Sequence, residues 1–509
     1  MEISSVPHVR VAVVGTGFGG IAAAARLLRD GETSVAVFER GASVGGVWRA
    51  NRYPGAACDV QSHLYELSLA PGADWSRRFA TQPEIEAYLC SVAERTGMLS
   101  HVRFHTDVAE AVWDAAAALW RLETSRGPWT ASVLVAAPGA LAEPRRPDIA
   151  GLDTFAGPVV HTALWPDGLD LAGKRVAVVG TGASAVQVVP ALQPAVAHLT
   201  VFQRSAPYIM PRHDRALTGS TRRALLRSPR LRRGVREALY RVRETYGLTL
   251  RHPRVGALAG LVARLHLRLQ VRDAALRARL APADTFGCRR VLLSDAYYPA
   301  LAQPNVTLAE GAAVAFRPGA VVDAAGVAHA ADAVVLATGF TVAEMPFARR
   351  VVGRGGRRLA DVWRARHAAH VGTTVAGFPN LFVIGGPNTS LGHTSVVLTI
   401  EAQVEHLIGA LAYSRAHGVA AVEPRPEAQA AFVADVDRMS AATVWTSGCR
   451  SGYVDSQGRN VALWPGTVAA FRRRVAPFDP AEYHLLPAPV PAVFVPAFPA
   501  RVRPQPIGV

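Results

Sequence analysis

"VRVAVVGTGFGGIAAAARLLRDG", residues 9–31, begins as an apolar strand, passes through a glycine-rich turn and continues with helical composition. The strand is the β-branched run at residues 9–14. The turn completes the motif G-x-G-x-x-G with Gly15, Gly17, Phe18, Gly19 and Gly20. Glycine permits the tight turn and lets backbone amides at the start of the helix approach a pyrophosphate. The stretch therefore predicts a dinucleotide-binding α/β unit.

A second apolar run, "SVAVFER" at residues 34–40, indicates the kind of dinucleotide. It reaches Glu39, 24 residues after Gly15. A carboxylate at the end of the second strand accepts hydrogen bonds from the two hydroxyls of a ribose. The first unit is therefore expected to bind a dinucleotide whose ribose diol is free.

The design repeats in "GKRVAVVGTGASAVQVVPAL", residues 173–192, where Gly180, Gly182 and Ala185 give G-x-G-x-x-A. The next apolar run ends at Arg204, again 24 residues after the first glycine, and Ser205 follows it. A guanidinium at this position can bind a ribose 2′-phosphate with two hydrogen bonds. One such turn also fits an ordinary α/β unit, but two matched copies favour paired cofactors, with NADP in the second site.

Composition narrows the possible partners. The chain has 509 residues and a formal charge of +16, yet Lys174 is its only lysine, so 54 of 55 basic residues are arginine. This skew, beside heavy use of alanine, fits genome composition better than selection for phosphate contacts. Nucleic-acid binding is therefore not expected, and an anionic cofactor, acidic substrate or carrier partner fits the charge at least as well.

The four cysteines, Cys58, Cys90, Cys288 and Cys449, lie far apart and form no C-x-x-C pair. A disulfide framework and a zinc cluster are therefore not expected, no metal site is predicted, and a reducing cytoplasm fits best. Neither a signal peptide nor a transmembrane run is visible.

The segment "FAGPVVHTALWPDG", residues 155–168, lies between the two units and has neither a strand nor a helix pattern. It matches the fingerprint F-x-G-x-x-x-H-x-x-x-W-P-D with Phe155, Gly157, His161, Trp165, Pro166 and Asp167. With "GGVW", "RYPGAACDV" and "GPNTSLGHTS" elsewhere, the chain resembles the type I Baeyer–Villiger monooxygenases, which are flavin-dependent and have two dinucleotide-binding domains. The resemblance extends from about Val9 to Tyr483.

The resemblance implies an oxidoreductase with FAD and NADP(H). NADPH reduces FAD, O₂ adds to give a flavin peroxide, and one oxygen atom is inserted beside the carbonyl of a small-molecule ketone to give an ester or lactone. The linker would join the FAD and NADP domains, with His161 and Trp165 fixing their relative position. Direct proton transfer by His161 is the less favoured role, because it requires proximity to the reacting atoms.

The resemblance also assigns the site residues. Arg290, in "GCRR", would stabilise the anionic oxygen species, and Asp59 would pair with it as the second catalytic residue. The resemblance extends the predicted FAD residues beyond the first turn and Glu39 to Val47, Trp48, Asp59, Tyr65 and Val108. The predicted NADP residues are Gly180, Thr181, Gly182, Ser184, Ala185, Gln187, Arg204, Ser205, Arg289 and Arg290. Arg289 stands where the family usually has lysine.

We predict the fold class α/β, with two Rossmann-like dinucleotide-binding domains and a helical insertion. The expected layout is discontinuous: FAD domain 1–150 and 341–486, NADP domain 151–214 and 284–340, helical insertion 215–283, and proline-rich tail 487–509. The insertion has leucine, valine and arginine at spacings of three and four, which is typical of amphipathic helices. Its arginine face is expected to be solvated; contact with a membrane or an acidic carrier protein is the alternative.

One departure from the family bears on the substrate. In "SGCRSGYVDSQG", Gly452 stands where the family usually has tryptophan, and loss of that ring removes a large apolar wall. The hypothesis that follows is a pocket enlarged for a bulky ketone.

Three other functions compete with this interpretation. A flavin monooxygenase that oxidises nitrogen or sulfur, or hydroxylates, shares both cofactor sites, and the full fingerprint argues against it. An NADPH-dependent disulfide reductase needs two cysteines close in sequence. A non-catalytic flavoprotein has no need of the complete set of cofactor residues.

Overall fold

The computed structural model describes residues 6–341, 345–446, 448–449 and 451–487. Its larger sheet has the order β17-β4-β5-β6-β1-β2-β3, with β18 also paired to β6. The strands are β1 (His8–Val14), β2 (Val35–Phe38), β3 (Val102–Arg103), β4 (Val108–Asp114), β5 (Leu119–Thr124), β6 (Gly127–Ala136), β17 (Val351–Val352) and β18 (Leu381–Val383). Strands β2, β1, β6 and β18 run parallel, so their carboxyl ends meet at one edge.

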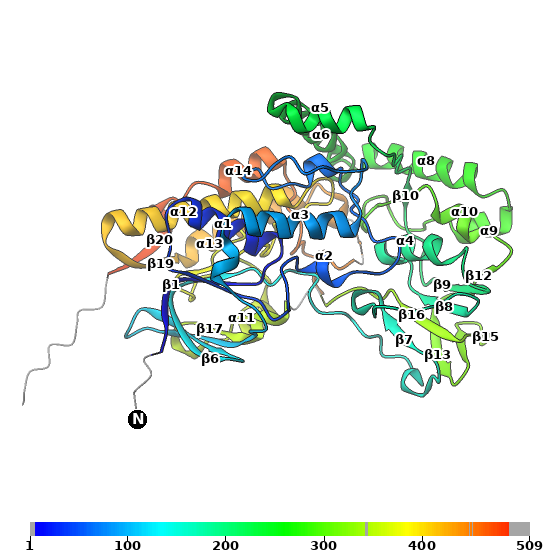
Figure 1. Cartoon of the computed structure of the whole chain (residues 1–509), viewed down its shortest axis with the longest axis horizontal. Coiled ribbons are helices and arrows are strands. Elements are labelled where there is room, and N and C mark those ends of the chain that lie inside the picture. Colours follow the sequence, from blue (N-terminus) through cyan, green and yellow to red (C-terminus); the bar gives the residue numbers. More distant parts are fainter. Residues whose placement is uncertain (1–5, 342–344, 447, 450, 488–509) are drawn as a thin grey trace, which may run out of the picture.

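Helices cover this sheet because its central strands are apolar on both faces. All four residues of β2 are buried, and Val11, Ala12 and Val13 of β1 are inaccessible to solvent. The covering helices are α1 (Phe18–Arg29), α3 (Gln82–Arg95) and α12 (Val397–His417), which share one apolar core with β1 and β2. Figure 1 shows these helices stacked above the sheet.

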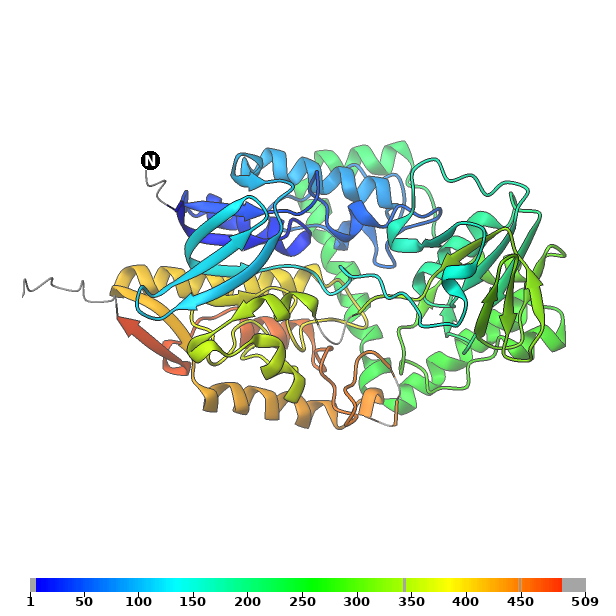
Figure 2. The ribbon, with the colours of Figure 1, turned by 90° about the horizontal axis from the view of Figure 1, so that it is seen from below.

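The second sheet is wholly parallel, in the order β12-β9-β8-β16-β7. Its strands are β7 (Val159–His161), β8 (Arg175–Val179), β9 (His198–Phe202), β12 (Val306–Leu308) and β16 (Ala333–Leu336). Helices α4 (Ala183–Leu192) and α10 (Tyr297–Leu301) pack on it, and a meander of β13 (Ala313–Arg317), β14 (Ala320–Asp323) and β15 (Ala328–Ala330) precedes β16. Figure 2 shows the two sheets in separate halves of the molecule.

The chain between β10 (Ile209–Met210) and β11 (Leu292–Leu293) is helical. Its helices are α5 (Gly219–Arg227), α6 (Pro229–Tyr246), α7 (Leu248–Arg251), α8 (Pro253–Gln270) and α9 (Ala274–Arg279). Helices α5, α6 and α8 lie along the upper edge in Figure 1.

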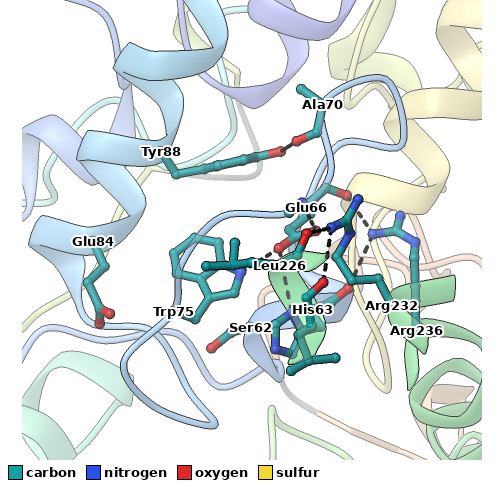
Figure 3. Close-up of polar contacts among 12 residues, drawn as sticks. Ser62, His63, Glu66, Ala70, Trp75, Glu84, Tyr88, Leu226, Arg232 and Arg236 are labelled. Atoms are coloured by element: carbon teal, nitrogen blue, oxygen red, sulfur yellow. Dashed lines mark hydrogen bonds and ion pairs between the residues drawn. The ribbon is translucent and has the colours of Figure 1, made fainter. Parts of the chain in front are cut away.

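Arginines of α6 attach the insertion to the first domain. Arg236 Nη1 donates to the backbone oxygen of Glu66, 2.8 Å away. The Glu66 carboxylate in turn accepts from the indole of Trp75 at 2.5 Å. Figure 3 shows Arg232 and Arg236 pointing toward the loop around Glu66. The Arg232 guanidinium also donates to the carbonyl of Leu226, at the end of α5. The inward side of α6 therefore includes paired arginines beside Leu239 and Tyr240, which pack against the core of the first domain.

The remaining elements complete the first domain. They are α2 (Val47–Ala50), α11 (Leu359–Ala365), α13 (Pro426–Ser440), α14 (Val468–Val475), β19 (Val419–Pro424) and β20 (Tyr483–Pro487). The predicted fold class, α/β with two dinucleotide-binding domains and a helical insertion, is confirmed. The proline-rich tail lies outside the described residues beyond Pro487. Within the described ranges, every helix is too short or too polar to cross a bilayer.

The sequence predicts no disulfide framework, and it also gives no sign of the single disulfide found among the described residues. Cys288 and Cys449 are joined by a disulfide, with Cα atoms 5.5 Å apart. Their separation of 161 residues gives no local spacing signal, which is why the sequence did not predict the pair. The indole of Trp445 also donates to the Gly287 carbonyl at 3.1 Å, so the segments around the two cysteines pack directly together.

Candidate active site between two dinucleotide sites

The first glycine turn lies where β1 and β6 end. Gly15 has φ +98°, and a Cβ there would come 2.5 Å from the carbonyl oxygen of Ala137. A Cβ on Gly20 would come 1.8 Å from the oxygen of Gly15. Both positions therefore require glycine, and the chain enters α1 with its first amides directed at the turn.

Glu39 directly follows β2 and lies beside this turn. Its carboxylate accepts from the Thr16 amide at 3.1 Å and the Thr16 hydroxyl at 2.5 Å. The other oxygen accepts from the amide of Gly41 at 2.7 Å. The Glu39 carboxylate is thus held beside the turn, where a ribose diol bound there would meet it.

Aromatic side chains predicted for the first site come together. The indole of Trp48 donates to the Tyr65 hydroxyl at 3.1 Å, and the rings of Phe18 and Tyr65 lie 4.8 Å apart. Val47 begins α2 in the same segment as Trp48. Val108 begins β4, and its carbonyl accepts from Arg350 at 2.8 Å.

Two hydroxyls in the loop after β18 support a bound cofactor. The side-chain oxygens of Thr394 and Ser395 are buried and have no hydrogen-bond partner among the described residues. The loop leaves the sheet edge that holds the glycine turn: a Cβ on Gly19 would come 2.9 Å from the side chain of Ile384. Buried hydroxyls are normally hydrogen-bonded, so a polar ligand at this edge would satisfy them.

The second glycine turn follows β8 in the same way. Gly180 has φ +117°, and its Cβ would lie 2.5 Å from the oxygen of Ala337. At Gly182 a Cβ would meet no atom within 4 Å in the part of the chain that the structure describes, which leaves open space above the start of α4. Thr181 donates its hydroxyl to the Ser205 carbonyl at 2.9 Å, joining this turn to the end of β9.

The other predicted NADP residues of α4 contact the sheet or the first domain. Ala185 is buried against the sheet, and Ser184 hydrogen-bonds Tyr53. Gln187 accepts from the Tyr53 hydroxyl at 2.8 Å and donates to the Ala57 carbonyl at 2.8 Å. Gln187 therefore connects the two domains, a role that the sequence did not predict.

Arg204 and Ser205 line a cleft of about 320 Å³ after β9. Arg204 is exposed, and its guanidinium has no hydrogen bond or ion pair within the described chain. Arg289 bonds to Ser205 and pairs with Asp284 at 2.7 Å. Arg279 also lines the cleft. Sequence reasoning missed Arg279, because it lies in the insertion and no motif marks it.

Arg290 and Asp59, 231 residues apart in sequence, form a bidentate pair. Arg290 Nε lies 2.9 Å from Asp59 Oδ2, and its Nη2 lies 2.8 Å from Oδ1. Burial alone raises the pKa of the Asp59 carboxyl, but the Arg290 guanidinium outweighs it and the pKa is lowered. The Asp59 carboxylate in turn raises the pKa of Arg290, so both groups stay ionised.

Arg243 of α6 adds a second guanidinium that the sequence did not single out among many arginines. Its Nη2 donates to the Asp59 carbonyl at 2.7 Å, and its Nε donates to Gln61 at 2.8 Å. Burial lowers the pKa of Arg243. Burial raises the pKa of the Tyr453 phenol, because the uncharged form is favoured there. Tyr453 also interacts electrostatically with Arg290. The pair is thus flanked by the insertion and the 451–455 segment.

The fingerprint segment is held by backbone contacts. Both ring nitrogens of His161 are engaged: Nε2 lies 3.1 Å from the Gly339 oxygen, and Nδ1 accepts from the Ala163 amide at 3.1 Å. Burial lowers the pKa of His161, so the ring is neutral at pH 7. This arrangement fits a structural role better than proton transfer.

The other fingerprint residues have varied surroundings. A Cβ on Gly157 would lie 2.1 Å from the Asp332 oxygen. Asp167 pairs at 3.5 Å with Arg52 of the other domain. Three aromatic or proline positions complete the set: Phe155 packs in the second domain's core, Trp165 is half-buried against it, and Pro166 is exposed.

Known proteins share this arrangement. Residues 12–225 match the pyridine nucleotide-disulphide oxidoreductase family. A Baeyer–Villiger monooxygenase of Streptomyces coelicolor is 47% identical over 489 residues, covering 95% of this chain and 94% of that protein. A Baeyer–Villiger monooxygenase of Pseudomonas aeruginosa is 41% identical over 492 residues, covering 96% and 93%.

Solved structures of monooxygenases are similar to this chain over nearly its whole length. Cyclohexanone monooxygenase from Rhodococcus sp. Phi1 bound to NADP⁺ superposes with a TM-score of 0.85 at 31% identity, covering 95% of this chain and 100% of that chain. An oxidized steroid monooxygenase bound to NADP gives 0.84 at 32% identity, with the same coverage. With identity at this level over nearly its full length, the chain belongs to the Baeyer–Villiger monooxygenase family.

Proposed function

We propose that this protein uses FAD and NADPH to insert one oxygen atom of O₂ beside the carbonyl of a bulky ketone, with Arg290 and Asp59 as catalytic residues. The observation that supports this most directly is the bidentate Arg290–Asp59 pair. When bound, FAD supplies the redox and oxygen chemistry, while the chain supplies position and charge.

Each cofactor has a set of residues suited to it. The first turn, with Glu39 and the hydroxyls of Thr394 and Ser395 that have no partner among the described residues, fits the polar parts of FAD. The second turn, with the exposed Arg204 beside its cleft, fits the 2′-phosphate of NADP.

Arg290 would stabilise the negative charge that develops on the substrate's carbonyl oxygen. A guanidinium fixed by two hydrogen bonds needs little reorganisation when that charge forms. Asp59 fixes its orientation, and 46% of the Arg290 side chain remains accessible to a reactant. His161 is a positioning residue that ties the linker to Gly339.

The decisive test is oxidation with NADPH and ¹⁸O₂ against a panel of ketones. One labelled oxygen in an ester or lactone product establishes the reaction. A labelled N-oxide or sulfoxide from amines and sulfides, with no ester from any ketone, would favour the rival monooxygenase. Disulfide reductase chemistry has little support, because it needs two cysteines close in sequence, and the bonded Cys288 and Cys449 lie 161 residues apart.

The substrate proposal makes a prediction at Gly452. The position is exposed, and a Cβ there would meet no atom of the described residues within 4 Å. A Gly452→Trp substitution is expected to lower kcat/KM for polycyclic ketones by at least about tenfold, because the ring fills space beside Tyr453, while small cyclic ketones are much less affected. Gly452→Ala is the matched control. Equal losses on large and small ketones would contradict the enlarged pocket.

A further inference from the structure

The outer face of α8 exposes a continuous row of aliphatic side chains. Its members are Val255, Leu258, Leu261, Val262, Leu265 and Leu269. Leu258 is 65% exposed and Leu269 73% exposed. Spacings of three and four place all six on one face of the helix, which is about 27 Å long at 1.5 Å per residue. Single exposed leucines are common, but a row of this length marks an interaction surface.

The insertion also holds most of the molecule's net charge. Residues 215–283 contain seventeen arginines and three acidic residues, so they contribute +14 of the formal +16. The apolar row therefore lies within the most positive part of the chain.

Two groups of these arginines differ in direction; the exposed Arg241, which pairs with Glu237 at 2.7 Å, belongs to neither. Those facing the protein are paired: Arg236 bonds to Glu66, and Arg243 bonds to Asp59 and Gln61. The outward group has no side-chain hydrogen bond or ion pair with any other described residue: Arg230, Arg233, Arg254, Arg264, Arg268 and Arg272. The inward arginines are bonded within the protein, whereas the outward arginines can bind a partner.

We propose that the apolar row of α8 and its flanking arginines dock this enzyme on the surface of a bilayer containing anionic lipid. Arg264 and Arg268 each lie one turn beyond Leu261 and Leu265, so they run along one border of the row. A helix with leucines on one face and arginines beside them lies in the plane of a membrane interface. Acyl chains would cover the leucines while headgroup phosphates bind the guanidinium groups.

The charge distribution favours a bilayer over a second copy of the chain. Helix α8 contains no aspartate or glutamate, so two copies packed on this face would bring like charges together without compensation. An acidic protein would meet the charge, but it would also need an apolar surface matched to a straight row of six aliphatic side chains. A lipid surface meets both requirements without such matching.

The test is flotation of the FAD-loaded enzyme with vesicles of phosphatidylcholine alone or with about one third phosphatidylglycerol, at low and high salt. The native chain should bind the anionic vesicles and release them at high salt. The variant L258E/L265E should bind at least about a hundredfold more weakly, because burial of each leucine accounts for roughly tenfold. NADPH oxidation, FAD content and thermal melting should be unchanged.

The matched control is V314E/V327E, which places glutamate at two exposed valines of the β13–β15 meander, at the opposite edge in Figure 1. It should bind vesicles like the native chain. Absence of vesicle binding, or equal binding by L258E/L265E, would overturn the proposal. A shift from dimer to monomer in L258E/L265E by sedimentation velocity would assign the face to a second copy instead. Retention on polyglutamate without vesicle binding would assign it to an acidic protein.

Discussion

Replacement of Arg290 by alanine is expected to lower ester formation at least about a hundredfold while FAD remains bound. Loss of one group that stabilises developing oxyanion charge typically lowers kcat by about 10²–10³. The substitution also leaves the Asp59 carboxylate without the partner that keeps its pKa low. Ester yield by gas chromatography, NADPH oxidation by absorbance and FAD content together separate loss of catalysis from loss of cofactor.

Two variants make this result interpretable. Arg290→Lys keeps the charge but cannot make the bidentate contact, so activity between those of alanine and arginine is expected. Arg272→Ala removes an exposed arginine whose side chain makes no hydrogen bond or ion pair in the described chain, and it should behave like the native enzyme. Product formation by Arg290→Ala at the native rate would remove Arg290 from the mechanism.

Local spacing predicted the cofactor turns well. Gly15 and Gly180 adopt the positive φ values that the motif requires, and Glu39 lies against Thr16 where the second strand ends. These features depend on contacts between adjacent strands, whose order follows from the strand–turn–helix pattern. The sequence therefore contained enough information for both turns.

Long-range contacts were harder to predict. The Arg290–Asp59 pair spans 231 residues and was expected only from the family resemblance. The Cys288–Cys449 disulfide had no comparable motif and was missed. Amphipathic spacing predicted the insertion helices, but it did not show that Arg243 points inward to Asp59. Helix periodicity defines faces without saying what each face packs against.

Cofactor choice should depend on Arg204. Substitution by alanine is expected to raise KM for NADPH about 10- to 100-fold, because a charge-assisted hydrogen bond contributes about 1.5–3 kcal/mol, and to leave KM for NADH nearly unchanged. Arg204 is free of other described partners, so its side chain needs to break no contact to bind a 2′-phosphate. Arg289 would first have to break its ion pair with Asp284 to bind the phosphate, so Arg289→Ala should raise KM for NADPH less than Arg204→Ala does.

Steady-state KM and kcat for both nicotinamide cofactors, with NADP⁺ affinity by calorimetry, measure this preference independently of the ketone. Arg317→Ala, at the exposed end of β13, is the matched control and should leave both KM values unchanged. If Arg204→Ala weakened NADPH and NADH equally, the guanidinium would be acting on the part the two cofactors share. The assignment of the cleft beside β9 to the 2′-phosphate would then be wrong, because only NADPH has that group.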